Sequence, residues 1–240
     1  MIQVNSLTKK YKEVAVLNID SLEIPSGEIC GLVGNNGAGK TTFFSLLLDL
    51  IKASTGHIIN NQVQVDMSED WKPFTSAFID ESFLIGYLTP EEYFYFIGEL
   101  RGLNQQDVDL FLQKFEDFFH GEILQGKKYL RDLSKGNQKK VGIVASFIGE
   151  PKVIILDEPF ANLDPSTQIR LKKLIGTYKD NPEVTLLISS HDLAHVTEVC
   201  QRIVVLNKGQ IVKDIQTSER TLRDLEGFFS EEILNETLVD

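Results

Sequence analysis

The chain has 240 residues, of which 42% are hydrophobic, and a formal net charge of −11 at pH 7. This length and apolar content suit one large domain with a packed core. The acidic balance argues against nucleic-acid binding, because a phosphate backbone requires a basic surface. The longest apolar stretch, residues 43–51, is too short to cross a bilayer. The N-terminus has no export-signal pattern, so we expect a cytoplasmic chain.

The first part of the chain predicts antiparallel strands. "MIQV" and "VLNIDSLEI" alternate apolar and polar residues, and "HIIN" and "VQV" flank a polar "NN" turn. Further along, short apolar strands alternate with helices, a pattern typical of an α/β fold with a mostly parallel sheet. Cys30 and Cys200 lie in apolar surroundings without CxxC spacing, which predicts two reduced core thiols.

Residues 82–149 interrupt this alternation with helical patterns only. Thr89, Pro90 and Glu92 form a helix start with a cap, an N1 proline and a capping-box acid. Apolar residues recur at helical spacing further on, at Val108, Phe111, Leu112, Phe115 and Phe119. We therefore expect a helical insert in the α/β core, and one or two further helices in the acidic residues 218–240.

Residues 34–42, "GNNGAGKTT", have the pattern of a phosphate-binding loop. They follow the buried-strand pattern "EICGLV" and precede the helical run "TTFFSLLL", the context that such a loop requires. Lys40 would reach the β- and γ-phosphates of a nucleotide, and the Thr41 hydroxyl would ligate Mg²⁺. The alternative, a glycine-rich turn with an incidental lysine, fits this context poorly.

Carboxylates and an imidazole follow two later strand patterns. "KVIILDEP" places Asp157 and Glu158 at the carboxyl end of a buried strand, where ligands bind in open α/β sheets. Asp157 is suited to position Mg²⁺, and Glu158 is suited to act as the base that activates the attacking water. "VTLLISS" leads to His191, which could contact the γ-phosphate. His191 and His195 share HxxxH spacing but lack the glutamate of a zinc motif. A solvated loop and a glycosidase-type carboxylate pair are the alternatives for the acids, and the upstream phosphate loop disfavours both.

"LSKGNQ" begins another predicted helix, with Ser134 as its cap. A helix start offers free N–H groups and a positive dipole end, which favour an anion. The chain thus carries two phosphate-binding elements far apart in sequence.

In order, "GNNGAGKTT", "LSKGNQ", "VIILDEP", "ANLD" and "SSHD" closely resemble the motifs of ATP-binding subunits of ABC transporters, and the resemblance covers nearly the whole chain. Residues 34–42 match the Walker A loop, 133–137 the signature motif, 153–158 the Walker B strand, and His191 the switch histidine. Leu163 and Asp164 match the D-loop. The resemblance implies a P-loop NTPase core over residues 1–217, with an antiparallel β subdomain and a helical subdomain, followed by a C-terminal tail.

The family resemblance also implies a function and partners. Such subunits hydrolyse ATP with Mg²⁺ and attach to the inner face of the cell membrane through a permease. Two copies pack head to tail, so Ser134 and Gly136 would bind the γ-phosphate held by the opposite Walker A loop. A homodimer is expected, and the cargo cannot be read from this chain.

The site residues implied by the resemblance fall into three sets. The catalytic residues are Glu158, His191 and Lys40. The nucleotide-binding residues are Tyr11, Asn35, Asn36, Gly37, Ala38, Gly39, Lys40, Thr41, Thr42, Ser134 and Gly136. The metal-binding residues are Thr41, Asp157 and Asp80.

The sequence departs from the common family pattern in two motifs. The signature has Lys135 in place of Gly and Asn137 in place of Gln. The segment "TSAFIDES" aligns with the Q-loop but carries Asp80, which resembles bacteriocin and antibiotic exporters and suggests an anion that meets Mg²⁺ or water. Tyr11 fits the aromatic residue that stacks on adenine, and a strand-end tyrosine is the alternative.

Other functions within the same ATPase family must be weighed. ABC-type ATPases also act in chromosome maintenance, DNA repair and translation on the ribosome. Those proteins carry long coiled coils, tandem domains or basic surfaces, and this sequence has none of these features. A stand-alone kinase or GTPase does not explain "LSKGNQ".

The predicted helix that starts at Thr89 carries Tyr93, Phe94, Tyr95, Phe96 and Ile97 in succession. Consecutive residues spread around a helix, so we expect part of this run to stay exposed and to border the groove that receives a permease helix. Complete burial is the alternative.

Overall fold

A computed structural model describes residues 1–124 and 126–237, with side chains described to residue 230. Its centre is a six-stranded sheet in the order β10-β9-β3-β8-β7-β6. These strands are β10 (Gln210–Gln216), β9 (Arg202–Asn207), β3 (Ile29–Val33), β8 (Thr185–Ser190), β7 (Val153–Leu156) and β6 (Thr75–Phe78). Only β10 runs antiparallel to its neighbour, so the mostly parallel sheet predicted from the sequence is confirmed.

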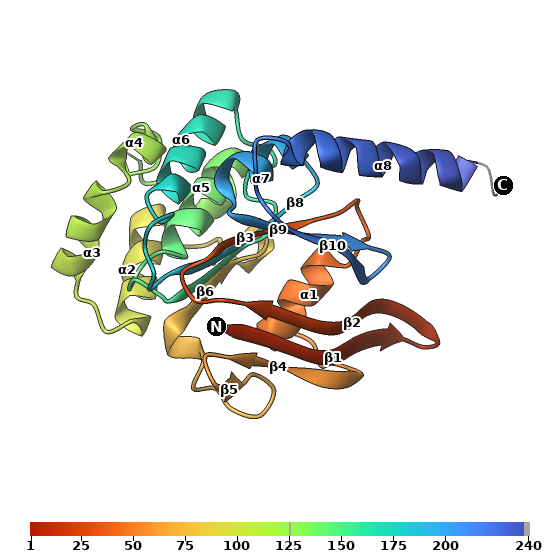
Figure 1. The fold of residues 1–240 in the computed structure, drawn as a ribbon. Helices are drawn as coiled ribbons and strands as arrows, with labels where there is room; N and C mark the ends of the chain where they lie inside the picture. Colours follow the sequence, from red (N-terminus) through yellow and green to blue (C-terminus); the bar gives the residue numbers. More distant parts are fainter. Residues whose placement is uncertain (125, 238–240) are drawn as a thin grey trace.

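The central strands are buried along their whole length. Every residue of β3, β7 and β8 is buried, which explains why apolar residues follow one another in these segments rather than alternating with exposed polar ones. Layers cover both faces of the sheet (Figure 1). The face toward α1 (Lys40–Leu47) shares one hydrophobic core with the N-terminal sheet, and the opposite face shares another with the helical region.

The N-terminal region forms the predicted antiparallel sheet. Its strand order is β2-β1-β4-β5, with β1 (Ile2–Tyr11), β2 (Val14–Ile24), β4 (Thr55–Asn60) and β5 (Val63–Gln64). Its inward side chains pack on Phe43 and Phe44 of α1, so this helix lies between the two sheets (Figure 1). The turn lies at Asn61 and Gln62, which have positive φ angles, one residue later than the predicted "NN" turn because Asn60 belongs to β4.

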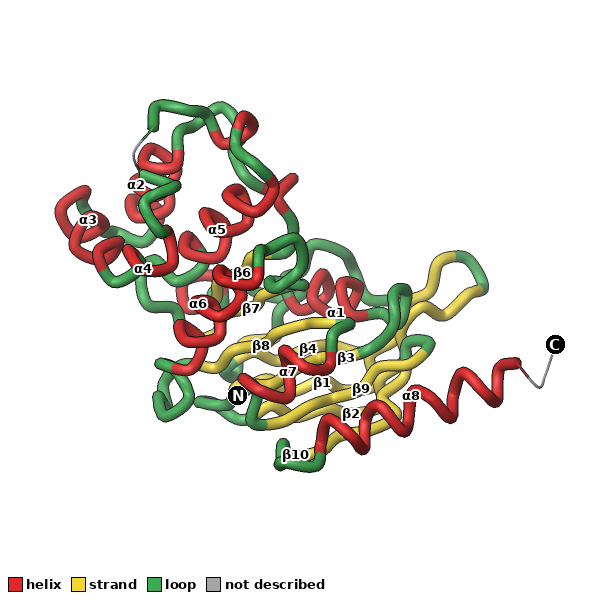
Figure 2. The backbone as a smooth tube through the Cα atoms, turned by 90° about the horizontal axis from the view of Figure 1, so that it is seen from above, coloured by secondary structure: helices red, strands yellow, loops and turns green. Residues whose placement is uncertain are grey.

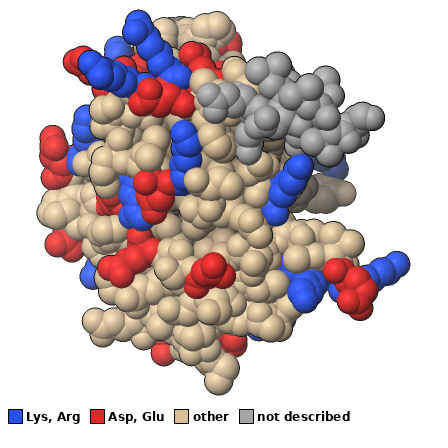
Figure 3. Space-filling model, turned by 45° about the vertical axis from the view of Figure 1, so that its right-hand side comes forward, with Lys and Arg blue, Asp and Glu red and all other residues tan. Residues whose placement is uncertain are grey.

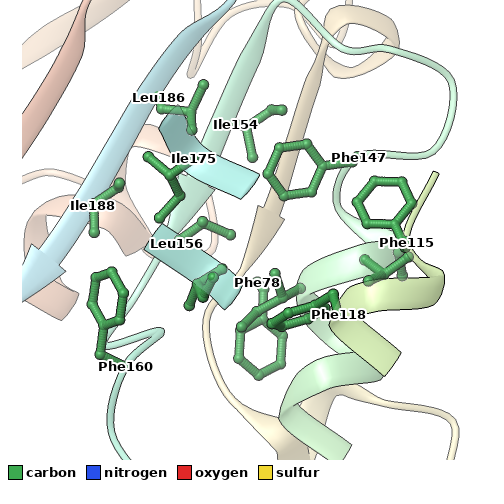
Figure 4. Packing of buried hydrophobic residues seen from close by; sticks show 14 of the residues in the cluster. Phe78, Phe115, Phe118, Phe147, Ile154, Leu156, Phe160, Ile175, Leu186 and Ile188 are labelled. Atoms are coloured by element: carbon green, nitrogen blue, oxygen red, sulfur yellow. The ribbon is translucent and has the colours of Figure 1, made fainter. Parts of the chain in front are cut away.

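The helical insert is also confirmed. After the short helices η1 (Lys72–Phe74) and η2 (Glu81–Phe83) come α2 (Pro90–Leu100), α3 (Gln105–Gln113), α4 (Glu116–Phe119), η3 (Leu130–Asp132) and α5 (Lys135–Ala145). Thr89 and Glu92 form the predicted capping box of α2. Phe115 packs on Phe147 with ring centres 5.9 Å apart, and Figure 4 shows Phe147 beside the sheet residue Ile154, so the helical core continues into the core of the sheet.

The remaining helices are α6 (Pro165–Gly176), α7 (Leu193–Val199) and α8 (Thr221–Thr237). Helix α8 begins against α7 and then extends away from the body of the molecule (Figures 1 and 2). The helical C-terminus is thus confirmed as far as residue 237, whereas the predicted boundary between a domain at 1–217 and a tail at 218–240 stays a prediction. Residues 238–240 lie outside the described part of the chain.

The aromatic run of α2 is more buried than its proposed docking role requires. Tyr93 is 9% exposed and Phe94 is fully buried, so neither is available for docking, whereas the expected partial exposure of the run is confirmed at Phe96; that the helix borders a permease groove stays a prediction. Tyr95 is half-buried, and its hydroxyl, a single donor, lies 2.8 Å from Asp109 Oδ1 and 3.0 Å from Glu91 Oε1. Phe96 is 39% exposed, so an apolar part of the helix does remain open. The inward residues face the helical core because α2 packs on α3 and α5.

Cys30 and Cys200 are buried and unpaired by any disulfide, as predicted. Burial raises the pKa of the Cys30 thiol to about 12. Within the described residues, no helix combines the length and apolar character that a bilayer span requires. On the face shown in Figure 3, Lys and Arg lie among Asp and Glu rather than in a separate patch.

Candidate nucleotide-binding and hydrolysis site

The site forms where neighbouring parallel strands end. Val33 of β3 pairs with Ser190 of β8, and Leu156 of β7 pairs with Ile188, so the three strands finish at one edge of the sheet. The chain leaves these strands into the phosphate loop, the Asp157-Glu158 pair and His191. Residues more than 150 positions apart in the sequence therefore lie at the same end of the sheet. In open parallel sheets, ligands bind at this carboxyl end of the strands.

The phosphate loop leads directly into α1, which begins at Lys40. Gly39 has φ +108°, and a Cβ there would lie 3.0 Å from Leu17 Cδ1, so the turn requires glycine. Gly37 has φ +84°, and a Cβ there would meet nothing within 4 Å, so the loop is open at that point. Asn35 and Asn36 are exposed beside it, whereas Ala38 is buried and anchors the loop. Backbone N–H groups at the start of α1 complete an anion-binding cradle.

Lys40 lies across this cradle with its ammonium buried. The side chain donates to Gly34 O at 2.6 Å and to Asn35 O at 3.4 Å. Its Nζ also lies 3.3 Å from Glu158 Oε1. The cation is thus held within reach of the loop, with backbone oxygens and one carboxylate as its partners.

Asp157 is a buried carboxylate, and each of its oxygens accepts a hydrogen bond from a hydroxyl. Thr41 Oγ1 donates to Oδ2 at 2.6 Å, and Ser189 donates to Oδ1. Burial raises the pKa of Asp157, and the hydrogen bonds from Ser189 and Thr41 oppose that rise. A hydroxyl and a carboxylate in contact are the hard oxygen donors that Mg²⁺ prefers, so these residues fit a magnesium site.

Glu158 connects the site to His191. Its Oε2 lies 2.9 Å from His191 Nδ1, and its backbone N–H donates to Ser189 Oγ at 2.8 Å. Glu158 Oε1 is buried and accepts no hydrogen bond within the described residues. The three residues assigned catalytic roles from the sequence, Lys40, Glu158 and His191, therefore form one connected group. Glu158 Oε1 instead forms an ion pair with the ammonium of Lys40, 3.3 Å away.

The signature motif lies at the start of α5, where Ser134 is the N-cap. Ser134 Oγ accepts the N–H of Asn137 at 3.2 Å, and Ser134 and Lys135 are exposed. At Gly136 an added Cβ would lie 3.2 Å from Asn162 O, so the D-loop packs closely on this turn. Neither Ser134 nor Gly136 hydrogen-bonds to the phosphate loop in the part of the chain that the structure describes. An open helix start of this kind is available to a ligand held by another molecule.

Tyr11 and Asp80 lie outside the connected group. Tyr11 ends β1 and is 54% exposed, with Lys9 Nζ 5.0 Å from the centre of its ring. Asp80 caps η2 by accepting the N–H of Ser82 at 2.8 Å, and hydrogen bonding to Ser82 lowers the pKa of the Asp80 carboxyl. Asp80 is therefore an anion, whereas its contact with Mg²⁺ or water remains a prediction.

Sequence reasoning missed two polar residues that touch the site. Ser189 joins Asp157 to the backbone of Glu158, and Lys139 of α5 donates to Glu158 O at 2.9 Å. Thr185 and Ser190 of the same strand also carry hydroxyls, so nothing in the sequence marked Ser189. Lys139 gave no signal either, because it follows the signature motif in a polar run. His195 stacks on Phe160 with ring centres 4.6 Å apart.

The sequence profile described as "ABC transporter" matches residues 17–161. The chain belongs to the ABC transporter ATP-binding family. An ABC transporter ATP-binding protein of Methanocaldococcus jannaschii, MJ1023, is 33% identical over 217 residues, which are 88% of this chain and 76% of that protein. The bacitracin transport ATP-binding protein BcrA of Enterococcus faecalis is 29% identical over 222 residues, covering 91% of this chain and 70% of BcrA.

Solved structures support the fold of this ATP-binding subunit. The dimeric bacterial ABC transporter cassette MJ0796 superposes with a TM-score of 0.81, at 21% identity over 91% of this chain and 99% of that one. An ATP-binding subunit of another ABC transporter gives a TM-score of 0.81 at 27% identity, over 95% of this chain and 93% of that one. The two-sheet core with a helical subdomain is therefore the ABC ATPase fold.

Proposed function

We propose that this ABC transporter ATP-binding subunit hydrolyses MgATP to ADP and phosphate and thereby powers export by a separate membrane permease. The observation that carries the proposal is the connected group of Lys40, Glu158 and His191 beside an open phosphate loop. Residues of the loop, with Tyr11 stacked on the adenine, bind the nucleotide. Thr41 and Asp157 would hold Mg²⁺, which would neutralise charge on the phosphates, and Asp80 would contact the ion through water.

Glu158 acts as the general base in this proposal. Its Oε1 takes a proton from the attacking water, and such a base contributes about 10²- to 10⁴-fold in rate. His191 holds the other carboxylate oxygen through Nδ1 and so fixes the direction of the base. Its exposed position also suits a contact with the γ-phosphate.

The proposed assembly is a head-to-tail homodimer bound to a permease at the inner face of the membrane. Ser134 and the N–H groups near Gly136 are open at the start of α5, and they would bind the γ-phosphate on the partner subunit's loop. The acid at position 80 and the likeness to a bacitracin transport protein support an exporter. The dimeric form of MJ0796 supports pairing of two cassettes.

Replacement of Glu158 by Gln tests the proposal. The variant should bind ATP normally, hydrolyse it at least about 100-fold more slowly because the base is lost, and accumulate as a dimer. Size-exclusion chromatography with ATP and with ADP measures the dimer, and phosphate release measures the rate. The same chain with Ser134→Arg added is the matched control. It should bind ATP and stay monomeric, because a long cation blocks the signature surface.

Hydrolysis by Glu158→Gln at the wild-type rate would show that Glu158 is not the base. A monomer at high concentration with ATP would contradict the composite site. Purification of the tagged subunit from its native membrane, followed by identification of the permease, tests the transport role and its direction.

A further inference from the structure

Lys139 is a buried cation that joins three parts of the molecule. It lies in α5, one turn after Ser134, and is 5% exposed. Its Nζ donates to the backbone oxygen of Glu158 at 2.9 Å and lies 3.5 Å from Glu81 Oε1. Lys139 thus joins α5, the helix that carries the signature motif, to the segment after β6 and to the end of β7.

Stability alone does not explain a lysine at this place. A buried ion pair contributes little net stability, because the cost of removing both charges from water offsets their attraction. Apolar side chains of the same size would fill the space equally well. A buried cation with a backbone oxygen as its nearest partner therefore has a geometric role.

The backbone of Glu158 requires support from outside. Its φ is +46°, a left-handed conformation that costs a residue with a Cβ free energy and persists only where the surroundings hold it. Ser189 accepts the N–H of Glu158, and Lys139 donates to its carbonyl oxygen. The peptide units on both sides of the Glu158 Cα are thus held by different elements, β8 and α5. The direction of the carboxylate follows from this backbone conformation.

We propose that Lys139 is a positioning residue for ATP hydrolysis, which holds the Glu158 backbone so that the carboxylate faces the attacking water. The inference rests on the proposed role of Glu158 as the base. Lys139 touches no nucleotide. Its side chain connects α5 to the backbone of Glu158. A displacement of α5 would therefore move the Glu158 carbonyl group.

The test separates the hydrogen bond to Glu158 from the ion pair with Glu81. Lys139→Met alone leaves Glu81 buried without its partner, which could unfold the chain. The double variant Lys139→Met/Glu81→Met removes both charges and keeps similar volumes. Glu81→Gln is the matched control, because it removes the carboxylate and keeps an acceptor for Lys139. Thermal melting establishes that each variant is folded before its kinetics are measured.

The double variant should lose about 10²-fold in kcat, the effect of a misplacement of roughly 1 Å, with KM for MgATP within twofold of wild type. It should also accumulate as a dimer with ATP, because binding is intact and hydrolysis is slow. Glu81→Gln should keep kcat within about twofold, since the bond to Glu158 remains.

A folded double variant with wild-type kcat would overturn the inference, as would equal losses of kcat in the double variant and in Glu81→Gln. Glu158→Gln is measured in parallel. If that variant hydrolyses ATP normally, the proposed function itself has failed. If it is inactive while the double variant is fully active, only the role of Lys139 is refuted.

Discussion

The ammonium of Lys40 lies 3.3 Å from Glu158 Oε1, so the cation of the phosphate loop and the proposed base are each other's partners. Lys40 also donates to Gly34 O at 2.6 Å, which folds the side chain onto its own loop. The phosphates of a nucleotide must compete with these oxygens for the ammonium. Binding of ATP would thereby release Glu158 to accept a proton from water, so nucleotide binding and activation of the base are linked.

We expect Lys40→Ala to weaken nucleotide binding and Glu158→Gln to leave it intact or strengthen it. Lys40→Ala removes charge-assisted hydrogen bonds worth about 1.5–3 kcal/mol, so MgATP affinity should fall roughly tenfold to a hundredfold, and hydrolysis should be lost. Glu158→Gln removes the competing carboxylate and should bind MgATP at least as tightly as wild type. Isothermal titration of both variants measures this. Wild-type affinity in Lys40→Ala, or a tenfold weaker Glu158→Gln, would contradict the link.

The parts of the site that carry their own chemistry could be predicted from the sequence. The phosphate loop, Asp157, Glu158 and His191 each follow an apolar strand pattern, and the parallel strands then bring them to one edge. The cap at Thr89 was equally readable, because it is a local interaction. Lys139 and Ser189 were not, because their contacts join Glu158 to residues 19 and 31 positions away on other elements.

Burial along α2 shows a second limit. The sequence predicts that five consecutive large side chains spread around the helix, but it does not fix which of them face the core. That depends on how α2 packs on α3 and α5, and the structure turns Tyr93 and Phe94 inward. The exposed aromatic residues lie instead in the segment before α2, at Phe83 and Tyr87, and just before η3, at Tyr129.

An exposed aromatic patch replaces that run as the predicted permease contact. It consists of Phe83, Ile85, Tyr87 and Tyr129, which are 62%, 40%, 71% and 44% exposed. The guanidinium of Arg131 lies 4.4 Å from the ring centre of Tyr87 and 5.5 Å from that of Tyr129. Exposed aromatic residues with an arginine are typical of protein interfaces. Since the family acts with membrane permeases, we expect this patch to bind the permease.

Tyr87→Glu should therefore reduce co-purification of the permease at least tenfold, because it places a charge in an apolar contact, and it should leave ATP affinity unchanged. Met67→Glu is the control, because Met67 is 76% exposed and follows the N-terminal sheet instead. Affinity purification from membranes and nucleotide titration measure the two effects. Full permease binding by Tyr87→Glu, or an equal loss with Met67→Glu, would refute the assignment.

Asp164 begins α6 as an N-cap with several hydrogen bonds. Its carboxylate accepts from Ser166 Oγ at 2.6 Å, from Thr167 Oγ1 at 2.6 Å and from the N–H of Thr167 at 3.0 Å. The hydrogen bonds from Ser166 and Thr167 hold the pKa of the Asp164 carboxyl well below its usual range. The native state therefore favours the ionised form, and the unfolded chain, with a pKa of about 3.9, binds the proton more readily.

The sign of the linkage predicts how Asp164→Asn depends on pH. A depressed native pKa gives stability that is fully present above the unfolded-state pKa and is lost as the pH falls from there toward the native pKa. Asparagine stays neutral, so the variant should be less stable than wild type at pH 7. The gap in free energy of unfolding should stay constant down to about pH 5 and shrink below about pH 4. Urea unfolding at a series of pH values measures the gap. A gap that does not change between pH 7 and pH 3 would show that the charge of Asp164 does not stabilise the start of α6.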